Sequence, residues 1–356
     1  MTIATCNTYR HSMAGKLLRG IGEADTEMIK SWQHLGIAVI LAMGGAIATA
    51  SSVLAQSITI DGTLSPAQTL TGPNYTIPQS VGQTVGSNLF HSFGIFNLNV
   101  GERANFGSAA DIRNIFSRVT GGSRSLIDGL IFTNSANVNL FLINPSGIVF
   151  GPNARLNVGD STRGSFVATT VDALVWSNGS QFSATNPGGA SSLLTIVGDP
   201  SGFLSTLRTP PPIEVSGSSL INGSSNNNPY NAQSLLLVGG DVRINNATLQ
   251  APGGRIELGG VAEPGNVGLS TNGNILSLNF PKNLARGDVS LTDGATLNTR
   301  AGNGGSIAIN ARNIDILGGS QVLAGIGSGL GTDESQAGDV TLNATSAIGI
   351  QGQNSR

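Results

Sequence analysis

Few residues after position 55 could perform acid–base or metal chemistry. His91 is the only histidine in that part of the sequence, and the single cysteine of the chain, Cys6, precedes it. A Ser-His-Asp triad or a zinc site needs a histidine with suitable partners. His91 stands among aromatic residues without a neighbouring Cys, Glu or second His. We therefore predict no catalytic residue, no metal site and no cofactor.

Aspartate is the second candidate for chemistry. Asp241, Asp288 and Asp339 each follow a glycine and precede a valine. Paired carboxylates are the catalytic groups of most glycoside hydrolases, and a repeating fold could align these three along one corner. Because each occupies the same position of one short pattern, we interpret them as scaffold. An extracellular polysaccharide-acting enzyme is the alternative.

Two glycine-containing motifs point to binding instead of catalysis. Arg286-Gly287-Asp288 matches an adhesion tripeptide, but other Gly-Asp pairs lack the arginine, so we interpret Gly-Asp as scaffold and Arg286 as incidental. Residues 325–331 lack the glycine spacing of a phosphate-cradling loop and the calcium-binding nonapeptide pattern. Neither motif predicts a ligand.

The elements that must position these residues are short strands. Apolar and polar residues alternate in residues 57–60, 95–100 and 137–143, and each segment ends at Gly, Asn or Pro. This period of two is typical of strands bounded by turns. Residues 111–119 are the best helix candidate, and we expect a short turn at most there.

A five-residue pattern recurs in the C-terminal half: Gly, a polar residue, a β-branched residue, any residue and an aliphatic residue. It begins at Gly240, Gly254, Gly287, Gly305 and Gly338. Such repeats are typical of a solenoid. In a parallel β-helix, inward Val, Ile and Leu side chains stack, Gly and Asn form the corners, and Asn side chains can hydrogen-bond in ladders. A β-sandwich offers no reason for the repeat.

The first 55 residues have the layout of a secretory signal peptide. Basic residues are followed by an uncharged apolar run over residues 35–50, and small residues lead to a predicted cleavage site after Ala55. This order of segments is typical of exported proteins. A membrane anchor would need about 20 apolar residues, and this run is shorter and interrupted by glycines.

The charge balance argues against a nucleic-acid partner. The chain has 18 Lys and Arg against 20 Asp and Glu, and Lys282 is the only lysine after the leader. Nucleic-acid binding needs a basic surface, which this composition does not build. With Cys6 alone, the exported part also lacks disulfides and must gain stability from packing.

Two segments carry a more specific signal. The first contains Phe90, Phe93 and Phe96, and the second contains the run Asn144, Pro145, Ser146, Gly147 and Ile148. Together they resemble the N-terminal domain of filamentous haemagglutinins and related two-partner-secretion exoproteins, in the form common among cyanobacteria. The run is similar to the family's Asn-Pro-Asn-Gly-Ile motif, with Ser146 at the third position. The family's Asn-Pro-Asn-Leu motif is absent from the corresponding residues 111–115.

The resemblance implies a right-handed, single-stranded parallel β-helix with an N-terminal β cap. It also implies export by a partner outer-membrane β-barrel transporter with periplasmic POTRA domains. The motif from Asn144 to Ile148 is then either a transporter contact or a corner between two strands. Pro145 and Ser146 allow a type II turn there, with Asn144 bonded back to the turn amides. The three phenylalanines are expected to cap or fill the core.

These features give a prediction for the whole chain. Residues 1–55 form the signal peptide, residues 56–200 the secretion domain, and residues 201–356 continuing β-helix repeats. We predict a secreted or outer-surface exoprotein that crosses the periplasm and acts as an adhesin on a host, cell-surface or glycan receptor. The alternatives are the polysaccharide-acting enzyme named above and a structural stalk for a further effector.

Overall fold

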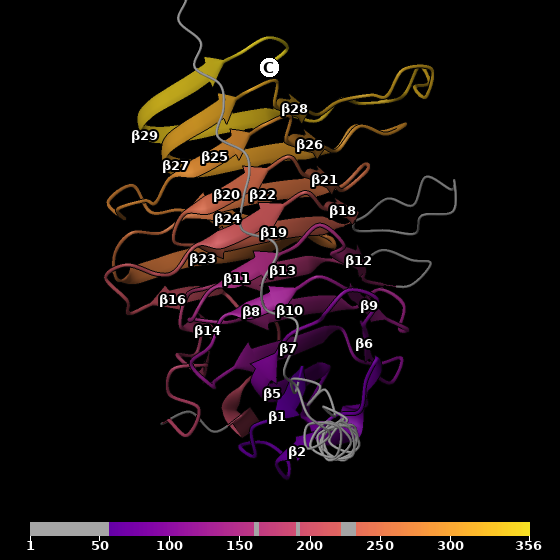
Figure 1. Ribbon diagram of the computed structural model, residues 1–356, viewed down its shortest axis with the longest axis vertical. Coiled ribbons are helices and arrows are strands. Elements are labelled where there is room, and N and C mark those ends of the chain that lie inside the picture. The colour runs from indigo at the N-terminus through magenta and orange to yellow at the C-terminus, as the bar shows by residue number, and fades with distance from the viewer. Residues whose placement is uncertain (1–56, 160–163, 190–192, 222–232) are drawn as a thin grey trace, which may run out of the picture. The chain divides into compact units, whose positions relative to one another are not determined.

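The computed structural model describes residues 57–159, 164–189, 193–221 and 233–356. Within the chain, Leu54–Arg356 forms one compact unit, whereas the predicted signal peptide and its cleavage site at Ala55 lie outside the described residues. The described part consists of short strands joined by turns (Figure 1). Its only helical elements are two 3-10 turns, η1 (Gln79–Val81) and η2 (Leu193–Thr195), so the predicted all-β class is confirmed.

Most strands belong to three parallel stacks, and successive strands of the chain pass from one stack to the next. The first stack contains β5 (Asn88–Phe96), β7 (Asn114–Val119), β10 (Asn139–Ile143), β13 (Phe166–Thr169), β19 (Ser234–Gly239) and β22 (Arg255–Gly260). The second contains β8 (Ser125–Ile127), β11 (Ile148–Phe150), β17 (Ile213–Ser216), β20 (Val242–Asn245) and β25 (Val289–Thr292). Two long strands, β27 (Ser306–Leu317) and β29 (Val340–Gln351), contribute to both stacks.

The third stack completes each coil. It contains β3 (Asn74–Ile77), β6 (Arg103–Phe106), β9 (Leu130–Thr133) and β12 (Arg155–Asn157), followed by β18 (Ser219–Ile221), β21 (Thr248–Gln250), β26 (Thr296–Asn298) and β28 (Gln321–Leu323). A coil such as β10, β11 and β12 therefore supplies one strand to each stack. This arrangement is a parallel β-helix, as the sequence predicted.

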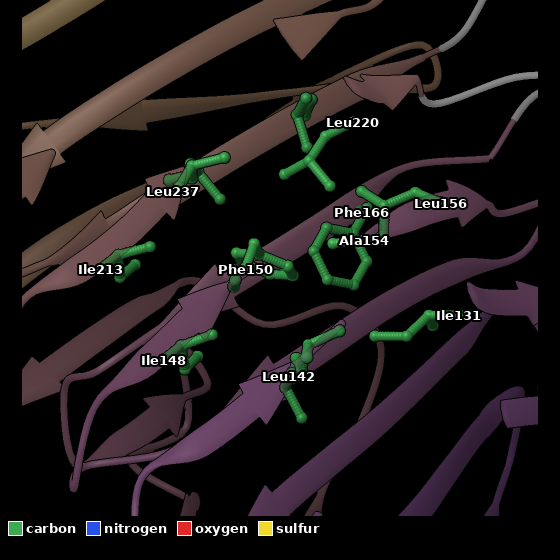
Figure 2. Close-up of a cluster of buried hydrophobic side chains, with 14 of the residues drawn as sticks. Ile131, Leu142, Ile148, Phe150, Ala154, Leu156, Phe166, Ile213, Leu220 and Leu237 are labelled. Atoms are coloured by element: carbon green, nitrogen blue, oxygen red, sulfur yellow. The ribbon is translucent and has the colours of Figure 1, made fainter. Parts of the chain in front are cut away.

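The core of the β-helix lies between the three stacks. Figure 2 shows Leu142, Phe166 and Leu237 from the first stack facing Ile148, Phe150 and Ile213 from the second and Ile131, Leu156 and Leu220 from the third. The alternation of side chains along each strand explains which residues enter the core. β11 and β17 bury every second side chain, as strands with one covered face do. Each fully buried Ile, Leu or Phe contributes roughly 1.5–3 kcal/mol.

Asparagine ladders connect successive coils, as predicted. The Asn114 side-chain amide donates to Asn88 Oδ1 at 3.0 Å, and the Asn139 amide donates to Asn114 Oδ1 at 3.0 Å, over separations of 26 and 25 residues. These separations give the length of an uninterrupted coil. A second, exposed ladder joins Asn343 to Asn310 at 2.9 Å.

An outer antiparallel sheet covers the first stack. It contains β15 (Gln181–Ser183), β14 (Ala173–Val175), β16 (Gly202–Ser205), β23 (Gly265–Asn272) and β24 (Ile275–Asn279), in that order. These strands come from two excursions of the chain that meet where β16 pairs with β23. Phe90, Phe116 and Phe141 point outward from the first stack into a second apolar cluster, which contains Trp176 and Phe182 from the outer sheet side. The first stack is therefore buried on both faces.

The N-terminal end of the β-helix carries antiparallel strands. β1 (Ile58–Ile60) pairs with both β2 (Gln68–Thr69) and β5, and β4 (Gln83–Val85) also pairs with β5. These strands occupy the edge of the first coil, where an uncovered strand could pair with another chain. They form the N-terminal β cap that the family resemblance implied.

The structure corrects two sequence predictions. The repeats of the C-terminal half belong to two stacks: Val242 pairs with Val289 in the second stack, whereas Ile307 pairs with both Ile256 and Val340 in the first. The common pattern arises because both corners need a glycine before an inward aliphatic residue. The expected turn within residues 111–119 is also wrong over most of its length, because β7 is a fully buried strand.

Candidate functional site

The motif from Asn144 to Ile148 forms the corner between β10 and β11. The Asn144 side-chain amide donates to the Ser123 carbonyl and to Ser125 Oγ, both at 3.0 Å, and both partners lie in the preceding coil. Its backbone amide donates to the Thr169 carbonyl of the following coil at 2.9 Å. Asn144 therefore forms hydrogen bonds with both the preceding and the following coil.

The turn itself is closed by Asn144 as predicted, but its type differs from the prediction. Asn144 Oδ1 accepts the Ser146 backbone N–H at 2.9 Å, and the Gly147 N–H reaches the Asn144 carbonyl at 3.0 Å. A type II turn needs a positive φ at Ser146. The positive φ, 110°, falls at Gly147 instead, where a side chain would be strained.

Burial divides the motif into two groups. Asn144, Gly147 and Ile148 are buried, whereas Pro145 and Ser146 are half-buried. In the folded domain only the second group reaches the surface. A partner that contacts Asn144 or Ile148 directly must therefore meet them before this corner forms.

The three predicted aromatic residues lie on β5 but face opposite sides. Phe93 and Phe96 point into the β-helix core, with ring centroids 5.1 Å apart, and Phe106 lies beside both. Phe90 points outward, and its ring centroid lies 5.0 Å from that of Phe182 in the outer sheet. The strand thus joins the core to the outer sheet.

His91 lies on the same strand and is fully buried. Its ring centroid is 6.0 Å from that of Phe93 and 5.9 Å from that of Phe106. Burial lowers the pKa of His91 to about 4, although a weaker interaction with the Val81 backbone opposes the shift. Among the described residues, no three His, Cys, Asp or Glu side chains gather where they could hold a metal ion.

The three aspartates do not form one row. Asp241 Oδ1 accepts the Asp288 backbone N–H at 3.0 Å, so these two stack in adjacent coils. Asp339 precedes β29 at the first stack, so the three aspartates do not share the single corner that a catalytic alignment would have needed. Arg286 of the adhesion-like tripeptide is 5% exposed and donates to the Asn343 carbonyl at 2.9 Å. It is therefore a packed scaffold residue.

Sequence reasoning missed a buried polar cluster around Arg118. Its guanidinium donates to Ser92 Oγ at 2.8 Å and to the Ser183 carbonyl at 2.7 Å, and Asp61 accepts a 2.6 Å hydrogen bond from the same Ser92. Burial lowers the pKa of Arg118 to about 10, while Asp61 opposes the shift. Burial alone would raise the pKa of Asp61, but hydrogen bonds led by that of Ser92 outweigh it and lower the pKa.

The Arg118 cluster joins the N-terminal cap, two coils and the outer sheet. One signal in the sequence could have revealed it. Arg118 is the single charge among the apolar residues Ile115, Phe116 and Val119 of β7, and such a charge is buried only with partners.

The fold defines this chain as a capped parallel β-helix whose distinctive motif residues stabilise corners between coils. The chain belongs to the TPS secretion domain family, whose model matches residues 56–309. TPS stands for two-partner secretion, and this domain targets its chain to a partner transporter. Proteins that carry it are secreted.

The chain is also similar to a solved structure, the HMW1 secretion domain from Haemophilus influenzae. The two share 19% sequence identity with a TM-score of 0.42, over 76% of this chain and 81% of that chain. No curated protein sequence matches the chain. Within the part that the structure describes, no helix is long and apolar enough to span a membrane.

Proposed function

We propose that residues 56–309 direct this protein to an outer-membrane β-barrel transporter with periplasmic POTRA domains. The signal peptide, residues 1–55, first brings the chain to the periplasm and is removed after Ala55. The β-helix then forms outside the cell, where the protein is released or held at the outer surface. Support comes from the family match and from the motif at the corner between β10 and β11.

One observation carries the proposed role of the motif. Asn144 uses its side chain and backbone to bind the coils before and after its own. These hydrogen bonds exist only when three coils have formed, so the same groups are free in the unfolded chain. We infer that the transporter contacts this segment while it is extended, and that folding of the corner releases the chain.

Secretion of variants from cells that contain the transporter tests the proposal. Asn144→Ala should leave most of the protein in the periplasm, because it changes both the recognised segment and the corner. Asn343→Ala, which removes an exposed ladder bond outside the family match, is the matched control and should be secreted normally. The measured quantity is the ratio of protein in the medium to protein in the periplasm.

A further variant separates recognition from folding. Pro145 and Ser146 are half-buried, so Ser146→Ala should change the stability of the domain by less than about 0.5 kcal/mol. A secretion defect in Ser146→Ala with an unchanged melting temperature would support direct contact. Normal secretion after deletion of residues 58–173 would refute the targeting role altogether.

We further propose that the exported protein acts as an adhesin for a host, cell-surface or glycan receptor. The haemagglutinin resemblance supports this role, whereas neither the enzyme nor the stalk alternative gains support from the described residues. Beads coated with the chain from residue 56 onward should adhere to cells more than uncoated beads. Equal adhesion of both would contradict the role.

A further inference from the structure

Four Asn-Gly pairs occur in the sequence, at Asn178, Asn222, Asn272 and Asn303. In such a pair the backbone nitrogen of the glycine can attack the side-chain amide of the asparagine, because glycine has no side chain that hinders the approach and its backbone is unusually free. Asn222 lies outside the described residues, and the other three asparagines are exposed. These three pairs differ in how the fold holds the two reacting groups.

The pair Asn178-Gly179 is held at both reacting groups. The Gly179 N–H donates to the Trp176 carbonyl at 2.9 Å. The Asn178 side-chain amide donates to the Thr195 carbonyl at 2.7 Å, and its Oδ1 accepts the Ser180 N–H at 3.0 Å. Because these hydrogen bonds must break before the glycine nitrogen can reach the side chain, we expect the fold to protect this pair.

The pair Asn303-Gly304 is held at the attacking nitrogen. The Gly304 N–H donates to the Gln336 carbonyl at 2.9 Å. This hydrogen bond fixes the glycine nitrogen and must also be lost before any attack on the Asn303 side chain. We therefore expect the fold to protect this second pair as well.

The pair Asn272-Gly273 lies at the tip of the hairpin between β23 and β24, at the edge of the outer sheet. Asn272 pairs with Ile275, and Gly273 and Asn274 connect the two strands. Gly273 has a φ of 62°. Within the described part of the chain, neither the Gly273 N–H nor the Asn272 side chain has a hydrogen-bond partner. Both reacting groups are therefore free and exposed.

We propose that Asn272 is a site of spontaneous deamidation in the folded domain. The Gly273 nitrogen attacks Asn272 Cγ and forms a bond to it, and the side-chain nitrogen leaves as ammonia together with the proton of the Gly273 N–H. Water then opens the cyclic imide at either of its two carbonyls and leaves aspartate or isoaspartate. Both products add a negative charge to the hairpin. Isoaspartate also inserts an extra atom into the backbone and so disturbs the pairing of residue 272 with Ile275.

Peptide mass spectrometry tests this proposal on the chain from residue 56 onward, incubated in mildly alkaline buffer with and without urea. The measured quantity is the rate of deamidation at each Asn-Gly pair. In the folded chain Asn272 should react at least about fivefold faster than Asn178 or Asn303, because each of these needs at least one hydrogen bond to break first. In urea the fold no longer protects any pair, and the three rates should become similar.

Asn272→Gln provides the matched variant, because a side chain longer by one methylene must close a larger ring and reacts more slowly. It should leave residue 272 unmodified and the rates at Asn178 and Asn303 unchanged. The comparison of folded and unfolded wild type decides the question even if this variant does not fold. An intact Asn272 in the folded chain, equal rates at the three pairs, or a difference that persists in urea would overturn the proposal.

Discussion

Replacing His91 with leucine should remove most of the loss of stability that this domain suffers in mild acid. In the folded protein, burial lowers the pKa of His91 from 6.5 to about 4. In the unfolded chain the imidazole binds a proton once the pH falls below its ordinary pKa of about 6.5. Across this window the unfolded state binds more protons, so the free energy of unfolding decreases as the pH falls from 6.5 towards 4.

The magnitude follows from the difference between the two pKa values. Each pKa unit corresponds to about 1.4 kcal/mol, so the shift predicts a loss of about 3 kcal/mol between the two ends of the window. Leucine is close to histidine in size and suits the contacts with Phe93 and Phe106. His91→Leu should therefore be about as stable as the wild type near neutral pH and more stable at pH 4.

Urea unfolding followed by circular dichroism at a series of pH values measures this effect. Carboxyl groups titrate in both proteins, so the difference between wild type and His91→Leu isolates the histidine. That difference should grow as the pH falls through the window. Parallel stability curves for the two proteins, with no divergence below pH 6.5, would refute the reasoning.

Two further substitutions test the contacts between coils. Asn114→Ala removes the central residue of the buried asparagine ladder and leaves Asn88 and Asn139 with unpaired groups. It should therefore lower the free energy of unfolding by about 2–4 kcal/mol. A loss below about 1 kcal/mol would show that the ladder contributes little. Gly147→Ala forces a side chain into a backbone with φ of 110° and should cost about 1–3 kcal/mol, measured as a lower urea midpoint. Gly188→Ala, where an added Cβ meets no neighbour, is the control and should change little; equal effects of both glycine substitutions would contradict the strain argument.

The β-helix could be predicted from the sequence because its inward residues alternate and recur. Outward residues of the second and third stacks are polar enough for that alternation to be visible, as in β17. The expected turn in residues 111–119 failed for the opposite reason. Ile112, Ile115, Phe116 and Val119 have helical spacing, yet β7 is a strand that is buried on both faces, so its polar residues do not mark a solvent side.

The outer sheet was not predicted, although one signal for it exists. β19 contains a continuous apolar run from Leu235 to Val238, and such a run indicates burial on both faces. The run does not indicate which strands cover its outer face, because β16 and β23 of the outer sheet pair across a long separation in sequence. The same holds for the polar residues: the corner at Asn144 is local and was one of the two readings of its motif, whereas Arg118 meets Ser92 and Ser183 only through the tertiary fold.

The outer sheet has a consequence for the order in which the domain can mature. Phe90 and Phe116 belong to the first coils, but the rings that cover them, Trp176 and Phe182, come later in the chain. If the N-terminal end leaves a membrane pore first, the outward face of these coils stays in contact with water until the segment of β14 and β15 has followed. A chain cut short before β14 would therefore be prone to aggregation as well as incomplete, and release of a soluble product reports that translocation has passed this point.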